Sequence, residues 1–107
     1  MDVVRHAERI HLPFIVLGEL RAGFAVGSRE VENLATLRQF LASPRVSLLN
    51  PDENTIEHYA RIFVDLRKKG AAIPTNDLWI AALALQHDLT LCSSDVHFRE
   101  VKGLRLC

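Results

Sequence analysis

The fold is decided by residues 74–87, which read Pro-Thr-Asn-Asp-Leu-Trp-Ile-Ala-Ala-Leu-Ala-Leu-Gln-His. Eight consecutive residues of this stretch, 78–85, are apolar, so the helix predicted over 77–87 is apolar almost all round. A helix of this kind must be covered by other elements on most of its surface. The stretch begins with the polar residues Thr75, Asn76 and Asp77. We therefore predict a buried helix that is opened by polar side chains.

Short apolar segments alternate with amphipathic segments on both sides of this helix. We predict strands over 12–17, 46–49, 89–92 and 104–106. We predict long helices over 29–42 and from about 50 to 69, and short helical pieces over 19–24 and 98–101. Residues 2–8 are typical of the end of a helix, and residues 93–95 of a turn. This alternation favours an α/β domain with a parallel sheet and helices on its faces. With neither a repeat nor a linker in the chain, we expect a single domain over 1–107.

Composition limits the classes of function. The chain has 107 residues, 13 basic and 13 acidic, and a formal net charge of zero. It therefore lacks the basic surplus of proteins that bind nucleic acid by bulk electrostatic attraction. A nucleic-acid enzyme remains compatible with this charge, because a bound metal ion can supply positive charge locally.

Targeting and cysteine patterns indicate a cytoplasmic protein. The longest apolar run, 78–85, is much shorter than the roughly 18 to 20 residues that span a bilayer. Residues 1–9 contain no signal-peptide core. Cys92 and Cys107 have neither metal-type nor redox-type spacing, so we expect two reduced thiols. A disulfide between them is the alternative.

Three carboxylates stand where an α/β sheet gathers functional groups. Glu19 follows the first predicted strand, Asp95 follows the strand over 89–92, and Asp77 opens the buried helix. Sites in open parallel sheets form at the carboxyl ends of the strands, so the three acids can meet there. Grouped carboxylates repel one another unless a proton or a cation intervenes. Hard oxygen ligands in this number suit Mg²⁺ or Mn²⁺.

Each acid also has a simple structural explanation. Asp77 and Glu19 both stand at the start of a helix, where the macrodipole favours negative charge. Asp95 can be a turn residue that accepts a hydrogen bond from its own backbone. We interpret the histidines as solvated or locally hydrogen-bonded, because none has the spacing of a zinc ligand: His6, His11, His58, His87 and His97.

Three stretches resemble the PIN-domain ribonucleases, and the VapC toxins among them. Residues 13–23, Pro-Phe-Ile-Val-Leu-Gly-Glu-Leu-Arg-Ala-Gly, resemble the family's second strand and the helix after it. Residues 73–82, Ile-Pro-Thr-Asn-Asp-Leu-Trp-Ile-Ala-Ala, resemble its central signature. Residues 91–98, Leu-Cys-Ser-Ser-Asp-Val-His-Phe, followed by Val101-Lys102-Gly103-Leu104, resemble its closing motif. The resemblance extends from about residue 5 to the end of the chain.

This resemblance implies an endoribonuclease that depends on Mg²⁺ or Mn²⁺, the toxin of a type II toxin–antitoxin pair. It implies an RNA substrate, commonly tRNA or rRNA, a homodimer, and a small antitoxin that blocks the acidic pocket. Glu19, Asp77 and Asp95 match catalytic, metal-binding acids of the family. Thr75, Asn76 and Ser93 match supporting polar positions beside those acids.

The chain departs from the family pattern at its start. The family begins with a central strand that ends in Asp followed by Thr or Ser, and then a helix; neither precedes residues 12–17 here. We therefore expect an N-terminally truncated domain in which Asp2 does not replace the missing acid and the strand over 12–17 has an open edge.

Two other functions stay open. The first is a non-catalytic PIN-derived module that only binds the antitoxin and dimerises, since one metal-ligating Asp is missing. The second is a phosphatase or receiver-type domain with an acidic pocket, although no suitably placed Lys follows the last strands.

Overall fold

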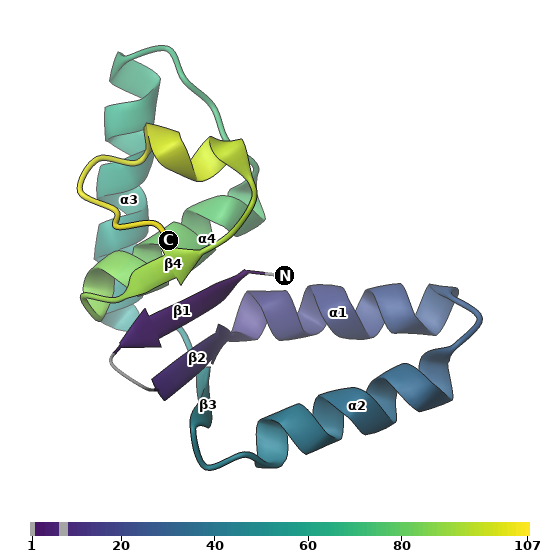
Figure 1. Cartoon of the computed structure of the whole chain (residues 1–107). Helices are drawn as coiled ribbons and strands as arrows, with labels where there is room; N and C mark the ends of the chain where they lie inside the picture. The colour runs from purple at the N-terminus through teal and green to yellow at the C-terminus, as the bar shows by residue number, and fades with distance from the viewer. Residues whose placement is uncertain (1, 7–8) are drawn as a thin grey trace.

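The computed structural model describes residues 2–6 and 9–107 as a small mixed sheet with four α-helices. The strands are β1 (Val3–His6), β2 (Arg9–Pro13), β3 (Val46–Leu49) and β4 (Thr90–Cys92). The helices are α1 (Phe14–Val26), α2 (Glu30–Ala42), α3 (Glu53–Lys68) and α4 (Thr75–Gln86), followed by the 3-10 helix η1 (Val96–Glu100). Figure 1 shows α1 and α2 as an antiparallel pair on one side of the sheet and α3 with α4 on another.

The sheet has the order β3-β2-β1-β4. Strands β2 and β3 are parallel, with Ile10 opposite Val46. Strand β1 is antiparallel to both neighbours, since Val4 faces His11 of β2 and Leu91 of β4. The prediction of an entirely parallel sheet is therefore wrong. Only two residues separate β1 from β2, and a parallel pair needs a crossover of about a dozen residues.

The N-terminal predictions need three further corrections. Residues 3–6 form a strand rather than the end of a helix; residues 7 and 8 of that prediction lie outside the described part. The strand predicted over 12–17 ends at Pro13, and residues 14–17 already belong to α1. A short apolar run fits a buried strand and a buried helix equally well by periodicity, which explains this error. The edge of β2 expected to be open is paired with β1.

The rest of the chain follows the sequence pattern more closely. Strand β3 has the predicted bounds, and the ends of α2, α3 and α4 differ from the predicted ones by three residues or fewer. The short helical piece predicted over 98–101 is η1. The strand predicted over 104–106 is reduced to an isolated bridge between Leu91 and Leu106.

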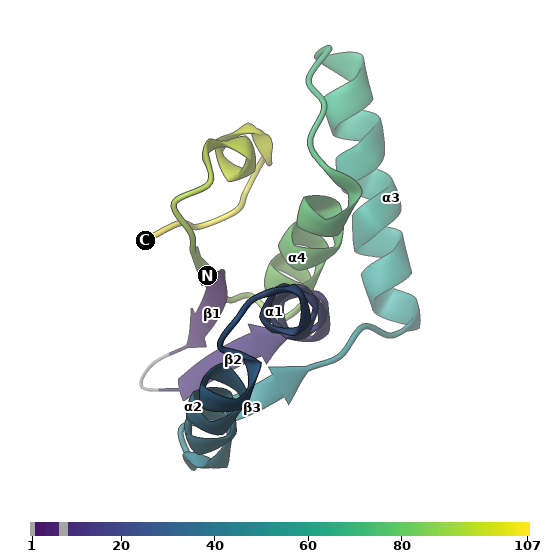
Figure 2. The same ribbon diagram turned by 90° about the vertical axis from the view of Figure 1, so that its right-hand side faces the viewer.

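Helix α4 lies at the centre of the core, as its composition predicts. Five consecutive residues, Ile80 to Ala84, have no exposed surface. The alanines in this run bring neighbouring elements close, and α3 packs along α4. Figure 2 shows α3 and α4 side by side and α1 and α2 seen end-on beside β2 and β3. Within the described ranges, no helix is long and apolar enough to cross a membrane.

The two cysteines form a disulfide, so the expectation of reduced thiols is wrong. The backbone N–H of Cys107 donates to the carbonyl of Leu91 at 3.0 Å. This contact lays the C-terminal segment along β4 and brings the Cα atoms of Cys92 and Cys107 to 4.9 Å. That separation is within the normal range for a disulfide. The pairing depends on a contact between segments that sequence spacing does not reveal.

Candidate metal centre

Two of the three predicted acids meet beside β4. Asp77 lies in the first turn of α4, and Asp95 is the residue that caps η1. Asp95 is held by its own turn: its Oδ1 accepts from the backbone N–H of His97 at 2.9 Å, and its N–H donates to Ser93 Oγ at 3.1 Å. The turn interpretation of Asp95 is therefore correct, and it is compatible with a place in the site.

His97 completes a group of three possible ligands. Its Nδ1 lies 2.9 Å from Asp95 Oδ1 and 3.4 Å from Asp77 Oδ2. One ligand atom of each residue lies within 4.8 Å of the others. The sequence interpretation of His97 as solvated or locally bonded was incomplete, because its contact with Asp77 joins two separate elements. Its position two residues after a candidate acid is the only signal that could have indicated this.

Asp77 is a buried carboxylate with an unsatisfied oxygen. The residue is only 8% exposed, and its Oδ2 has no hydrogen-bond partner. His97 Nδ1 at 3.4 Å is near enough for electrostatic attraction but too far for a good hydrogen bond. Buried polar atoms are almost always paired, so an oxygen left in this way points to a ligand.

The two aspartates have opposite electrostatic surroundings. Burial, followed by the negative charge of Asp95, raises the pKa of Asp77 to about 6. The hydrogen bond from the His97 backbone lowers the pKa of Asp95. A divalent cation between the carboxylates would offset both the burial cost and the repulsion. The donor set of two carboxylates and an imidazole fits such an ion.

Asp2 lies closer to this group than the sequence suggested. Its Oδ1 accepts a hydrogen bond from Ser93 Oγ, and its charge contributes to the raised pKa of Asp77. Because β1 is antiparallel to β4, Val3 pairs with Cys92 and the start of β1 lies at the carboxyl end of β4. A helix over 2–8, as predicted, would not place Asp2 beside β4 in this way.

The remaining predicted site residues have different positions. Glu19 is exposed on α1 and lines a cavity with Asp2, Val16 and Leu20. It is outside the metal-type group found among the described residues. Thr75 and Asn76 are exposed at the start of α4. Ser93 connects Asp2 to the turn that holds Asp95.

Known proteins with similar sequences identify the family of this chain. The PIN domain family matches residues 2–104. This chain belongs to the PIN domain family. Ribonuclease VapC1 of Haemophilus influenzae (strain R2866) is 34% identical over 99 residues, which cover 92% of this PIN domain and 72% of the relative. Ribonuclease VapC5 of Mycobacterium tuberculosis is 29% identical over 106 residues, covering 96% and 76%.

Solved structures give the same assignment for this PIN domain. VapBC2 from Rickettsia felis, bound to a DNA fragment from its promoter, has a TM-score of 0.82 at 28% identity, covering 91% of this chain and 72% of that chain. VapBC-1 from nontypeable Haemophilus influenzae has a TM-score of 0.82 at 29% identity, covering 92% and 73%. The resemblance to VapC-type PIN domains that the three motifs indicated is confirmed, as is the α/β PIN-like fold class.

Proposed function

We propose that this PIN domain is an endoribonuclease that hydrolyses RNA phosphodiester bonds with the help of Mg²⁺ or Mn²⁺. The observation that carries the proposal is the buried, unsatisfied Oδ2 of Asp77 beside Asp95. Such an oxygen raises the free energy of the folded protein unless a cation or a proton binds there, and the nearby Asp95 and His97 offer further ligands for a cation. The names of the VapC ribonuclease relatives support the nuclease class.

The chain's own residues have distinct parts in this activity. Asp77 and Asp95 would hold the ion, and Glu19 would face the substrate and the ion from α1. The bound ion supplies a water molecule of lowered pKa and offsets the charge of the phosphate. Ser93 fixes the turn of Asp95 through the N–H contact at 3.1 Å. Thr75 and Asn76 would donate hydrogen bonds to phosphate oxygens at the start of α4, where the helix dipole is positive.

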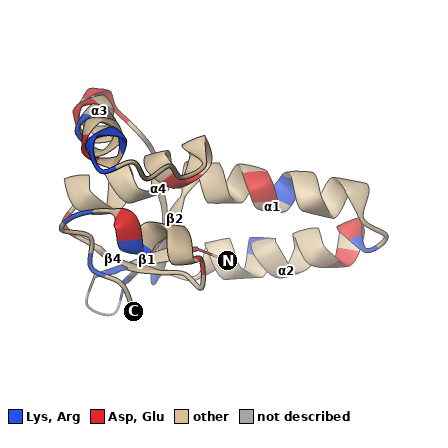
Figure 3. Ribbon diagram, turned by 90° about the horizontal axis from the view of Figure 1, so that it is seen from above, with Lys and Arg blue, Asp and Glu red and all other residues tan. Residues whose placement is uncertain are grey.

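The distribution of charge supports dependence on a metal. Figure 3 shows acidic and basic residues interspersed on α1, α2 and α3 rather than gathered into a basic face. The chain has zero net charge, and the site has carboxylates at its centre. The site therefore repels a phosphodiester until a cation binds. Removal of the metal should therefore weaken RNA binding as well as cleavage.

We extend the proposal to a protein partner and a location. Both solved structures described above are VapBC assemblies, which supports an antitoxin as partner. We assign tRNA or rRNA as the RNA class and the cytoplasm as the location, on the family resemblance.

A homodimer is also proposed, on the evidence of an apolar groove. Phe14, Ile15, Ile56 and Trp79 line it, and Phe14 and Ile56 remain more than half exposed. Exposed apolar surface of this kind is typical of protein contacts. We expect wild-type protein to sediment as a dimer and Ile56→Glu to sediment as a monomer with an unchanged circular dichroism spectrum. A dimeric Ile56→Glu variant would show that the dimer interface lies elsewhere.

The experiment that tests the nuclease proposal is cleavage of a fluorescent structured RNA with Mg²⁺, Mn²⁺ or EDTA. We expect Asp77→Asn and Asp95→Asn each to lose about 100-fold or more in rate, because each removes a charged ligand. Asp88→Asn is the matched control, since its side chain is 85% exposed and paired with Arg105 outside the site. Full activity of either site variant would contradict the assignment.

The alternative function is a non-catalytic module that binds an antitoxin. The position of Glu19 outside the metal-type group favours it, since only two of the three predicted acids meet. Metal-dependent cleavage by wild-type protein, abolished by Asp77→Asn, would eliminate this alternative. Metal binding without cleavage would support it.

A further inference from the structure

We propose that His97 is a nitrogen ligand of the metal centre and that the centre consequently prefers Mn²⁺ to Mg²⁺. This inference rests on the proposed function for the presence of the ion, but it concerns ion binding and not RNA cleavage. It assigns a role to His97, which is not among the site residues predicted from the sequence.

The position of the imidazole is the first argument. His97 Nδ1 lies 2.9 Å from one carboxylate oxygen and 3.4 Å from the other. Adjacent ligands of an octahedral ion with bonds of about 2.1 Å lie about 3 Å apart. The two distances from His97 Nδ1 are therefore close to those between neighbouring ligands of one ion, and the whole group of ligand atoms lies within 4.8 Å.

The unsatisfied oxygen of Asp77 is a second, independent argument. The side chain of Asp77 is 11% exposed, and its buried Oδ2 lies 3.4 Å from His97 Nδ1 without a hydrogen bond. A ring that served only to hydrogen-bond Asp95 would leave this oxygen unpaired. An ion bound by all three residues pairs it.

Local structure holds the ring near the carboxylates. The backbone N–H of His97 donates to Asp95 Oδ1 at 2.9 Å, so both side chains leave the same turn. The side chain of His97 is 46% exposed, so its Nε2 can keep a proton and bond to water while Nδ1 binds the ion. This is the neutral tautomer that metal coordination requires.

Ligand chemistry gives the ion preference. Mg²⁺ is held by oxygen ligands, whereas the divalent ions of the first transition series accept imidazole nitrogen. Mn²⁺ binds both carboxylate oxygen and imidazole. A site with two carboxylates and one imidazole therefore favours Mn²⁺ more than a site built from acids alone.

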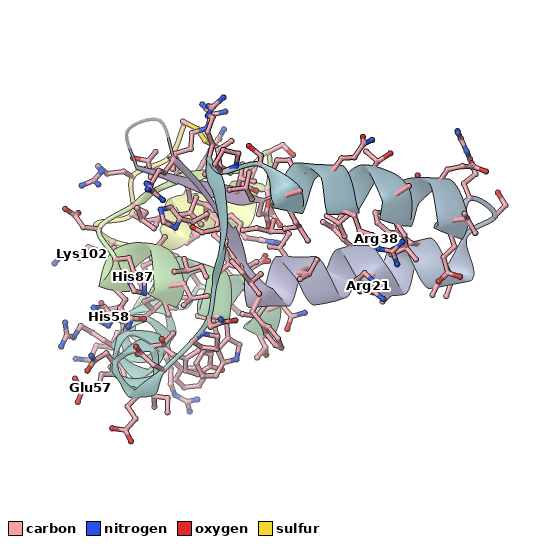
Figure 4. All side chains as sticks on the ribbon, turned by 90° about the horizontal axis from the view of Figure 1, so that it is seen from below. Arg21, Arg38, Glu57, His58, His87 and Lys102 are labelled. Carbon is pink, nitrogen blue, oxygen red and sulfur yellow. A yellow bond between two sulfur atoms is a disulfide. The ribbon has the colours of Figure 1, made fainter. Side chains whose placement is uncertain are left out.

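The first measurement is calorimetric titration of the 107-residue protein, free of any histidine tag, with Mn²⁺ and Mg²⁺ in the absence of RNA. We expect His97→Ala to weaken Mn²⁺ binding by about 10-fold or more and Mg²⁺ binding by less. His97→Asp should restore Mg²⁺ binding and reduce the ratio of Mn²⁺ to Mg²⁺ affinity. The control is His87→Ala. His87 lies at the end of α4, near His58 of α3 (Figure 4).

The second measurement needs no variant that must fold. Pulsed electron paramagnetic resonance of wild-type protein with Mn²⁺ should show ¹⁴N modulation from a bound imidazole. Absence of this modulation, Mn²⁺ affinity unchanged in His97→Ala, or wild-type protein that binds neither ion would overturn the inference. Nitrogen coupling in a protein that does not cleave RNA would overturn only the nuclease proposal. RNA cleavage without nitrogen coupling would overturn only the role of His97.

Discussion

Helices α3 and α4 both begin close after a proline and carry an aspartate at the start, but their carboxylates have opposite surroundings. Asp52 caps α3 in full: its Oδ1 accepts from the N–H groups of Asn54 and Thr55 and from Gln86 Nε2 at 2.7 Å. Asp77 in α4 is buried, and its Oδ2 accepts no hydrogen bond. These contacts lower the pKa of Asp52, chiefly through Gln86, while burial raises that of Asp77.

The difference separates an acid that stabilises the fold from one that costs stability. A carboxylate that accepts several hydrogen bonds favours the folded state when it is charged. A buried carboxylate without a donor disfavours the folded state when it is charged, and acids with pKa values raised in this way cluster at functional sites. Identical residue types at similar helix positions are thus distinguished by their donors and their burial, not by sequence.

The strongest test of this comparison is how much Mn²⁺ stabilises wild-type protein and a variant at each of the two aspartates. At an Mn²⁺ concentration 100 times the Kd, binding should stabilise wild-type protein by about 2.7 kcal/mol. That corresponds to a rise in Tm of about 10 °C or more for a domain of this size. Asp77→Asn should lose this rise, and Asp52→Ala should retain it from a lower starting Tm. The measurement is thermal melting by circular dichroism, with EDTA as reference. An equal rise in Asp77→Asn would place the ion elsewhere.

A smaller effect is expected from the buried half of the α3 cap. The Thr55 side chain is fully buried; its hydroxyl accepts from the Asp52 N–H at 2.8 Å and donates to Gln86 Oε1. Thr55→Val keeps the shape but leaves two polar partners unpaired, which should cost about 1–2 kcal/mol in the free energy of unfolding. Urea denaturation measures this loss. Thr36→Val is the control, because the Thr36 hydroxyl donates a hydrogen bond to the Glu32 carbonyl on an exposed part of α2. Equal stability losses in both variants would argue against the cap.

A further effect is the dependence of stability on pH without metal. Asp77 has a folded pKa of about 6, above its ordinary 3.8, so protonation favours folding. Stability should therefore rise as the pH falls from above 6 towards 4. Asp52 has a lowered pKa, so its contribution should be lost as the pH falls below 3.8. Tm measured in EDTA from pH 8 to 3 should show a maximum near pH 4 to 5. Asp77→Asn should lose the rise, while Asp52→Ala should lose part of the acid decline.

Local patterns were sufficient to predict the centre of the fold. The apolar run of α4, the start of α3 and the bounds of β3 depend on neighbouring residues, and each lies where the sequence indicated. The predictions failed where distant segments decide the outcome. Pro13 divides an apolar run between strand and helix, and Cys107 reaches Cys92 only because its segment follows β4.

The candidate site, too, could be predicted only in part from the sequence. Asp77 and Asp95 belong to stretches whose spacing indicated a sheet-edge site, and the structure places them together. His97 contributes through a contact with a different helix, and Asp2 through the direction of β1. Neither the helix contact nor the strand direction could be derived from sequence spacing.

The hydrogen bond between Asp2 and Ser93 joins residues that are 91 positions apart in the chain. During synthesis, β1 emerges from the ribosome long before its partner β4, and the two can pair only after the chain has been made through Cys92. Contacts of such long range form slowly and late in folding. A growing chain therefore has no complete site until the segment that carries Asp95 and His97 has been made, and a polypeptide interrupted before that segment would never acquire one.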